Sequence, residues 1–278
     1  MNTDIADQVA DIAQRISRLS PQSVEKPVLV YFDIVGICWP IRCLLHLKAV
    51  DYELIKIPLQ AWAYRSPDGK QPLPASFRNG HVPLYVDPDV YLTQSNVIMA
   101  YLAEKHDLLG DDIAEKLACM DVMAHAYDAL FHWSGLFQVN VRMNTPDEVV
   151  ASRLEAFMGH GSWGLLSDGY NRNLDAFERY LNSNPDQDSG FMVGSRLSVA
   201  DLHAFNVLCN WYKAFDRNAF VANHPRLDDY VRSVASIPEV DDYVRHHQEQ
   251  TLWFPLPQLA VKLTAPEDLK DLTTPSPR

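Results

Sequence analysis

The chain has 278 residues, of which 47% are hydrophobic, and a formal net charge of -12 at pH 7. A single core seldom grows beyond about 250 residues, so two domains are expected. The negative charge disfavours a nucleic-acid partner and an anionic membrane surface, because both would repel it. The four cysteines are too few for a disulfide framework and lack metal-ligand spacing. They indicate free thiols in a reducing, cytoplasmic location.

The first 25 residues predict an amphipathic helical extension. Apolar residues recur at helical spacing among polar ones, at Ile5, Val9, Ile12, Ile16 and Leu19. The stretch lacks the basic start and continuous apolar core of a signal peptide. We expect it to pack on the protein's own surface. No run of about 18 apolar residues occurs, so no membrane span is expected.

Residues 26–108 predict a small α/β domain. Apolar, β-branched and aromatic runs indicate strands at 27–32, 52–57, 81–87 and 91–93. Helices are expected from Pro40 to Lys48 and from Gln94–Ser95 onward, with a long loop over 58–80. Two parallel strands followed by an antiparallel hairpin form a thioredoxin-like arrangement.

Residues 111–250 show helical patterns only, so this domain is predicted to be all-α. The expected helices cover 114–142, 152–181, 199–215, 227–236 and 240–249. Prolines separate these segments. Residues 251–278 are rich in proline and are expected to lie over the surface or to fray.

Four motifs occur in order. They are Tyr31–Gly36 followed by Ile41–Arg42, Leu92–Asn96, Ser198–Leu202 and Ile237–Val240. Together they resemble the cytosolic glutathione transferases, particularly the tyrosine-using classes, with the mu and sigma classes most similar. The resemblance covers residues 26–250. It implies a detoxifying homodimer that conjugates glutathione, as co-substrate and without a metal, to a small hydrophobic electrophile.

The resemblance assigns the catalytic role to Tyr31, at the end of the first strand. A thiol with a pKa of about 8.5 is only a few per cent thiolate at neutral pH. Lowering that pKa by about two units requires roughly 2.7 kcal/mol. One hydrogen bond to a charged group supplies roughly 1.5–3 kcal/mol, so one phenol hydroxyl can do most of this work alone. Val35 and Ile37 stand where the sigma, pi and alpha classes carry an arginine, so Tyr31 would act with less help.

The glutathione backbone would be held at two places. Val82–Pro83 matches the family's cis-proline step, whose backbone pairs with the glutathione cysteine, although an ordinary edge-strand proline is the alternative. Gln94 and Ser95 open a helix, and a helix N-terminus suits the γ-glutamyl carboxylate. Ser95 is equally suited to be an N-cap.

The remaining glutathione ligands come from the resemblance as well. Trp62 would offer its indole to the glycyl carboxylate, with Lys70 as the cation and Arg65 as the alternative. Asp128 would reach the glutathione amino group across the dimer, with Asp121 competing for that role. The flanking contacts are assigned to Phe32 and Ile37.

The electrophile pocket is assigned to Ile34, Phe137 and Phe254, and Trp133 and Trp253 could line it too. Such aromatic residues often belong to a plain core, so the sequence leaves the electrophile unidentified. Phe77 is a candidate for the aromatic residue that inserts into the second subunit of the dimer. Ser198 and Asp201 form a capping-box-like pair, which we expect to be structural.

Three alternatives remain open at this point. Cys38, at the start of the first helix, could be a nucleophile of a thiol transferase, because a helix N-terminus lowers a thiol pKa. Trp39, between that cysteine and Pro40, argues against it. The chain could also be a non-catalytic relative that binds apolar ligands, since a fold alone does not confer function. Isomerisation with glutathione as a cofactor is the third alternative.

Overall fold

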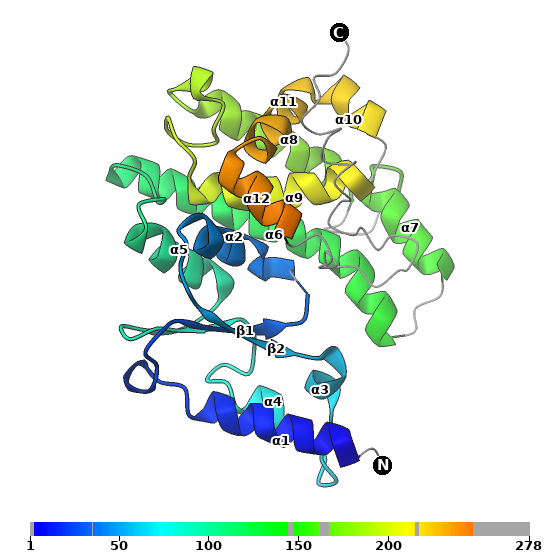
Figure 1. Cartoon of the computed structure of the whole chain (residues 1–278). Helices are drawn as coiled ribbons and strands as arrows, with labels where there is room; N and C mark the ends of the chain where they lie inside the picture. Colours follow the sequence, from blue (N-terminus) through cyan, green and yellow to red (C-terminus); the bar gives the residue numbers. More distant parts are fainter. Residues whose placement is uncertain (1–2, 35, 144–146, 162–166, 215–216, 247–278) are drawn as a thin grey trace. The chain divides into compact units, whose positions relative to one another are not determined.

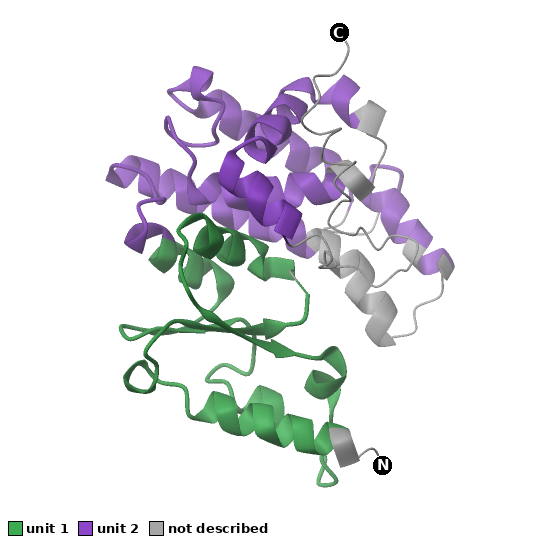
Figure 2. Ribbon diagram, in the orientation of Figure 1, with its two compact units in different colours: residues 1–102 green, residues 103–278 purple. Residues whose placement is uncertain are grey.

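The computed structural model describes residues 3–34, 36–143, 147–161, 167–214 and 217–246. The chain divides into two compact units, residues 1–102 and 103–278 (Figure 2). The first unit contains a four-stranded sheet, and the described part of the second is built from helices. The predicted fold class, a thioredoxin-like α/β domain followed by an all-α domain, is confirmed.

The sheet has the order β2-β1-β3-β4. Its strands are β1 (Val28–Phe32), β2 (Glu53–Ile57), β3 (Leu84–Val86) and β4 (Tyr91–Thr93). β1 and β2 are parallel, whereas β1–β3 and β3–β4 are antiparallel, as predicted. Asp87 closes the β3–β4 turn, because its Oδ1 accepts the N–H groups of Asp89 and Val90 at 2.9 and 3.0 Å.

Side chains alternate between the two faces of the sheet. Val28 and Val30 belong to a core cluster on one face, which places Leu29 and Tyr31 on the other. The N-terminal helix and two short helices cover the first face, and two longer helices cover the second (Figure 1). On the first face lie α1 (Thr3–Ser17), α3 (Leu59–Ala63) and α4 (Pro72–Ala75). On the second lie α2 (Trp39–Leu47) and α5 (Ser95–Lys105).

The N-terminal extension is the predicted amphipathic helix, and it is packed. Val9, Ile12 and Ile16 of α1 are buried in the same cluster as the first-face residues of the sheet. The expected loop over 58–80 differs from the prediction, since it contains α3 and α4. These helices are so short that their apolar residues show no repeating pattern in the sequence. A 3₁₀ turn, Gly36–Cys38, precedes α2.

In the described part of the second unit, every regular element is a helix. Its helices are α6 (Ile113–Met143), α7 (Asp147–Phe157), α8 (Gly169–Ser183), α9 (Val199–Ala214), α10 (Arg217–Asn223), α11 (Pro225–Ala235) and α12 (Pro238–His246). Helix α9 is the centre of the core, because every side chain from Val199 to Trp211 is buried. It packs against α6 and α11.

The prediction of one helix over 152–181 is wrong, because α7 and α8 divide that segment. Gly159 and Gly161 adopt φ angles of 95° and 133°, which end the helical path. Gly169 begins α8 against the ring of Phe157, where a Cβ atom would lie 2.7 Å from the ring. Helix α10 was not predicted as a separate element. Residues 247–278, including the end of the last expected helix and the tail, lie outside the described residues.

The Ser198–Asp201 pair has the predicted structural role at the start of α9. The backbone N–H and the hydroxyl of Ser198 donate to Oδ2 of Asp201, both at 2.9 Å. The N–H of Met192 donates to Oδ1 at 2.8 Å, and the Tyr230 hydroxyl donates to the same oxygen at 3.3 Å. Asp201 therefore ties the loop before α9 and helix α11 to one helix end. Burial raises the pKa of this carboxyl to about 6.

Candidate functional site

The strand register brings the motif residues of the first unit to one edge of the sheet. Val30 pairs with Leu84, and Leu84 pairs with Thr93. One residue beyond this row, toward the edge of the sheet, Tyr31, Pro83 and Gln94 occupy neighbouring positions. The carboxyl end of β2 lies at the same edge, because Phe32 pairs with Ile57. Open α/β sheets commonly bind ligands beside the carboxyl ends of their parallel strands.

Tyr31 lies on the sheet face that α2 and α5 cover. Its side chain is 2% exposed, and its ring centroid is 5.3 Å from that of Phe32. Phe32 is half-buried and packs against the core of the opposite face. A hydrogen bond made by a buried phenol is stronger than one made in water, because the local dielectric constant is lower.

The Val82–Pro83 peptide bond is cis, as the resemblance implied. Pro83 is buried directly before β3. Val82 is partly buried and packs against the same core cluster as Phe32 and Trp62. These predicted residues therefore share one packing environment.

Gln94 has an unusual backbone conformation at the start of α5. Its φ angle is 77°, in the left-handed region that non-glycine residues seldom adopt, and its side chain is exposed. Such a conformation costs about 1–3 kcal/mol and concentrates at ligand-binding sites. The Gln94 carbonyl accepts the N–H of Ile98 at 3.0 Å, so the residue occupies the N-cap position. Ser95 follows as a buried first residue of the helix.

Trp62 lies between two aromatic rings. Its ring is 5.3 Å from Phe32, edge to face, and 5.7 Å from Phe77. Phe77 is 5% exposed and belongs to the core cluster beneath α1. The structure therefore argues against the expectation that Phe77 inserts into a second subunit, because its side chain is buried within the chain.

The two candidate cations, Arg65 and Lys70, lie at the two ends of one tight turn, residues 65–70. The Nζ atom of Lys70 is 2.7 Å from Asp68 Oδ2, and the side chain is 80% exposed. The hydrogen bond from Lys70 lowers the pKa of the Asp68 carboxyl. Arg65 donates to the carbonyl of Gly69 at 3.2 Å. Both side chains keep further N–H donors with which to bind a ligand carboxylate.

Cys38 does not have the environment of a nucleophile. Its side chain is fully buried, and burial raises the pKa of its thiol well above the ordinary value despite the opposing charge of Arg42. A thiol that stays protonated and inaccessible is a poor nucleophile. The structure therefore argues against the thiol-transferase alternative.

The remaining predicted residues lie after β1, on α6 or outside the described part of the chain. Ile34 and Ile37 are half-buried in and around the 3₁₀ turn after β1. Asp128 is exposed on α6, whereas Asp121 accepts a hydrogen bond from the Tyr180 hydroxyl at 3.1 Å. The structure does not describe Val35 and Phe254, nor the side chain of Phe137. The same holds for the side chain of Trp133 and for Trp253.

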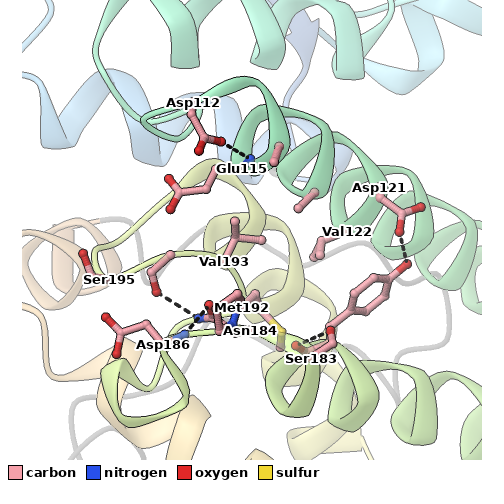
Figure 3. Close-up of a pocket in the computed structure, with 15 residues that line it drawn as sticks. Asp112, Glu115, Asp121, Val122, Ser183, Asn184, Asp186, Met192, Val193 and Ser195 are labelled. Atoms are coloured by element: carbon pink, nitrogen blue, oxygen red, sulfur yellow. Dashed lines mark hydrogen bonds between the residues drawn. The ribbon is translucent and has the colours of Figure 1, made fainter.

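A separate groove of about 530 Å³ lies within the second unit, between α6, the end of α8 and the loop before α9 (Figure 3). Four carboxylates line it, from Asp112, Glu115, Asp121 and Asp186. Asp112 caps α6 by accepting the N–H of Glu115 at 2.9 Å, and Glu115 accepts the N–H of Asp111 at 2.8 Å. Glutathione carries two carboxylates of its own, so this acidic groove does not suit it.

No helix among the described residues is both long enough and apolar enough to cross a bilayer. Within the same residues, no group of three or more His, Cys, Asp or Glu side chains is arranged to hold a metal ion.

Comparison with known proteins adds independent information. The family model of the glutathione S-transferase N-terminal domain matches residues 27–104, and the family model of the C-terminal domain matches residues 166–247. Glutathione S-transferase alpha-3 of Rattus norvegicus is 31% identical over 208 residues, which cover 73% of this chain and 80% of the rat protein. The chain belongs to the glutathione S-transferase family. Glutathione S-transferase A1 of Mus musculus is also 31% identical, over 66% of this transferase and 72% of the mouse protein.

Solved structures of glutathione S-transferases show the same fold. A monomeric transferase from the hookworm Necator americanus has a TM-score of 0.66 at 18% identity, covering 81% of this chain and 98% of the other. The transferase of Ascaris lumbricoides has a TM-score of 0.64 at 21% identity, with coverages of 80% and 97%. Members of this enzyme family use glutathione as co-substrate, bind electrophiles and are typically dimeric. The mu/sigma-like class of this transferase stays a prediction.

Proposed function

We propose that this transferase conjugates glutathione to a small hydrophobic electrophile and that the Tyr31 hydroxyl keeps the thiol ionised. The observation that carries the proposal is the register that gathers Tyr31, Val82–Pro83 and Gln94–Ser95 at one sheet edge. The strained backbone of Gln94 supports a ligand site at that edge. The burial of Cys38 removes the competing nucleophile.

In this proposal, backbone groups hold most of the tripeptide. The N–H and C=O of Val82 pair with the cysteinyl residue of glutathione, in the manner of a one-residue strand addition. The γ-glutamyl carboxylate binds the N-terminus of α5 at Gln94 and Ser95, where the first helical N–H groups lack an intrahelical acceptor. The indole of Trp62 and the ammonium of Lys70 bind the glycyl carboxylate, with Arg65 as the alternative cation.

Side chains complete the site. Phe32 and Ile37 flank the glutathione, and Ile34, Phe137 and Phe254 form the apolar wall for the electrophile. No metal takes part, since the thiolate is stabilised by a hydrogen bond. All four cysteines are unpaired and buried, which supports the proposed cytoplasmic location.

Tyr31→Phe is the decisive variant. Loss of one hydrogen bond to a thiolate, worth about 1.5–3 kcal/mol, lowers kcat/KM about 10- to 150-fold and raises the pKa seen in its pH profile by about 1–2 units. The KM for glutathione changes less than about twofold, because the tripeptide keeps its backbone contacts. The assay is conjugation of an activated aryl chloride, followed by screens of epoxides and enones.

Tyr85→Phe is the matched control. Tyr85 is buried on the neighbouring strand, and its hydroxyl donates to Asp87 at 3.3 Å. This variant should lose stability but keep its pH profile. Full activity in Tyr31→Phe, with an unchanged profile, would refute the assignment. Glutathione that is regenerated instead of consumed would identify an isomerase, and binding without turnover of any electrophile would identify a non-catalytic relative.

We also propose that two copies pair through α6. Exposed apolar side chains lie along one face of this helix, at Ile113, Leu117, Met120 and Phe131. Leu117, for example, is 59% exposed. A soluble monomer seldom leaves such a continuous apolar stripe in water. Asp128 borders this stripe and is exposed, which suits the predicted contact with glutathione in the partner copy.

A further inference from the structure

Helix α1 has one apolar face, and that face is buried. Val9 and Ile16 are each 1% exposed and Ile12 is 8% exposed, while residues between them such as Asp11 are exposed. A polar helix with one fully buried stripe is held by tertiary packing. The N-terminal helix is therefore an integral part of the first unit.

The partner of that face is the segment from α3 to Phe77. Val9, Ile12 and Ile16 share a core cluster with Ala61 of α3, and the same cluster includes Leu73 of α4 and Phe77. Helix α1 contacts both α3 and α4. Arg15 of α1 also forms an ion pair with Glu53 of β2.

Helices α3 and α4 are too short to be stable by themselves. They contain 5 and 4 residues, whereas an isolated helix needs about 12–15 residues to be even marginally stable in water. Their position must therefore come from what packs on them. In the shared core cluster, the sheet and α1 supply that packing.

Trp62 receives its position from this packing. It belongs to α3, it is half-buried against the shared cluster, and its ring contacts Phe32 at 5.3 Å and Phe77 at 5.7 Å. Phe77 belongs to the same core cluster as the buried face of α1. A row of aromatic contacts thus runs from the core under α1, through Trp62, to the strand end that carries Tyr31.

We propose that α1 is a positioning element for glutathione binding, acting through Ile12 and its neighbours Val9 and Ile16 on the segment that carries Trp62. This inference rests on the proposed function of Trp62. The residues of α1 touch no reactant. They fix the orientation of the indole, so their loss weakens glutathione binding without affecting the chemistry at Tyr31.

Full-length Ile12→Ala is the test, with Ile12→Leu as the conservative variant and Ile12→Val as a milder truncation. In Ile12→Ala we expect the KM for glutathione to rise about fivefold or more, while kcat and the KM for an aryl chloride stay within about twofold. Ile12→Leu is expected to keep the wild-type KM for glutathione. Ile12→Val, which should fold in any case, is expected to give an intermediate rise in that KM. Val231→Ala is the control, because Val231 is fully buried in α11 of the second unit.

Hydrogen exchange of the backbone amides in residues 59–77 gives a readout that needs no glutathione. Exchange there should accelerate at least about tenfold in Ile12→Ala and stay unchanged in Val231→Ala. If Ile12→Ala loses thermal stability but keeps its KM for glutathione, α1 has only a structural role and the inference is overturned. If the wild type neither binds nor turns over glutathione, the proposed function fails first and the inference falls with it.

Discussion

Asp201→Ala tests how far one buried carboxylate holds the helical unit together. In the variant, the N–H groups of Met192 and Ser198, which now donate at 2.8 and 2.9 Å, lose their acceptor inside the core. Each buried donor left unsatisfied costs about 1–3 kcal/mol, so we expect a loss of about 2–6 kcal/mol in the free energy of unfolding. The Tyr230 hydroxyl keeps a second acceptor, the Asp201 carbonyl at 3.1 Å, which keeps the loss within that range.

The same variant makes a prediction about pH. Burial raises the pKa of Asp201 to about 6 from 3.8, so the folded chain holds this proton more tightly than the unfolded chain. The stability that Asp201 contributes is complete below the unfolded pKa and falls as pH rises through about 6. The loss on substitution should therefore be about 1 kcal/mol larger at about pH 5 than at about pH 7.

Urea unfolding followed by circular dichroism at the two pH values measures both effects. Asp175→Ala is the control, because Asp175 is an exposed residue of α8. It should change stability by less than about 0.5 kcal/mol. A loss below about 1 kcal/mol in Asp201→Ala would refute the reasoning, since a buried donor pair could then lose its acceptor almost without consequence.

Two further predictions concern the second unit. Burial lowers the pKa of His203 in α9 from 6.5 to about 4, so its contribution is complete above 6.5 and is lost as pH falls toward 4. Lowering the pH from about 7 to about 5 should destabilise the wild type by about 2 kcal/mol relative to His203→Gln, as measured by urea unfolding, and parallel curves would contradict this. Leu117→Glu should convert a dimer to a monomer in light scattering because it places a charge in the exposed stripe of α6. A wild type that is already monomeric would rule out pairing through that stripe.

The sequence was sufficient to predict the sheet, because its strands are short apolar runs with turn residues between them. Tyr31, Pro83 and Gln94 could be placed at strand ends, and the register then brought them to one edge. The cis bond before Pro83 depended on the resemblance, since most X-Pro bonds are trans.

Other features depended on contacts that no local pattern shows. Phe77, for example, is buried in a cluster whose other members come from α1 and from the sheet, which are distant in sequence. The break between α7 and α8 was marked by Gly159 and Gly161, but glycines inside a helical pattern do not always end a helix. Helices α3 and α4 were too short to give a periodic signal.

The pairing of β1 with β3 makes Tyr31 sensitive to strand length. Inserting one residue between Val28 and Val30 would shift every later side chain of β1 to the opposite side of the sheet. The phenol would then point toward the N-terminal helix, and Val30 would take its former place. Engineers who wish to alter this protein should therefore leave the number of residues in β1 unchanged.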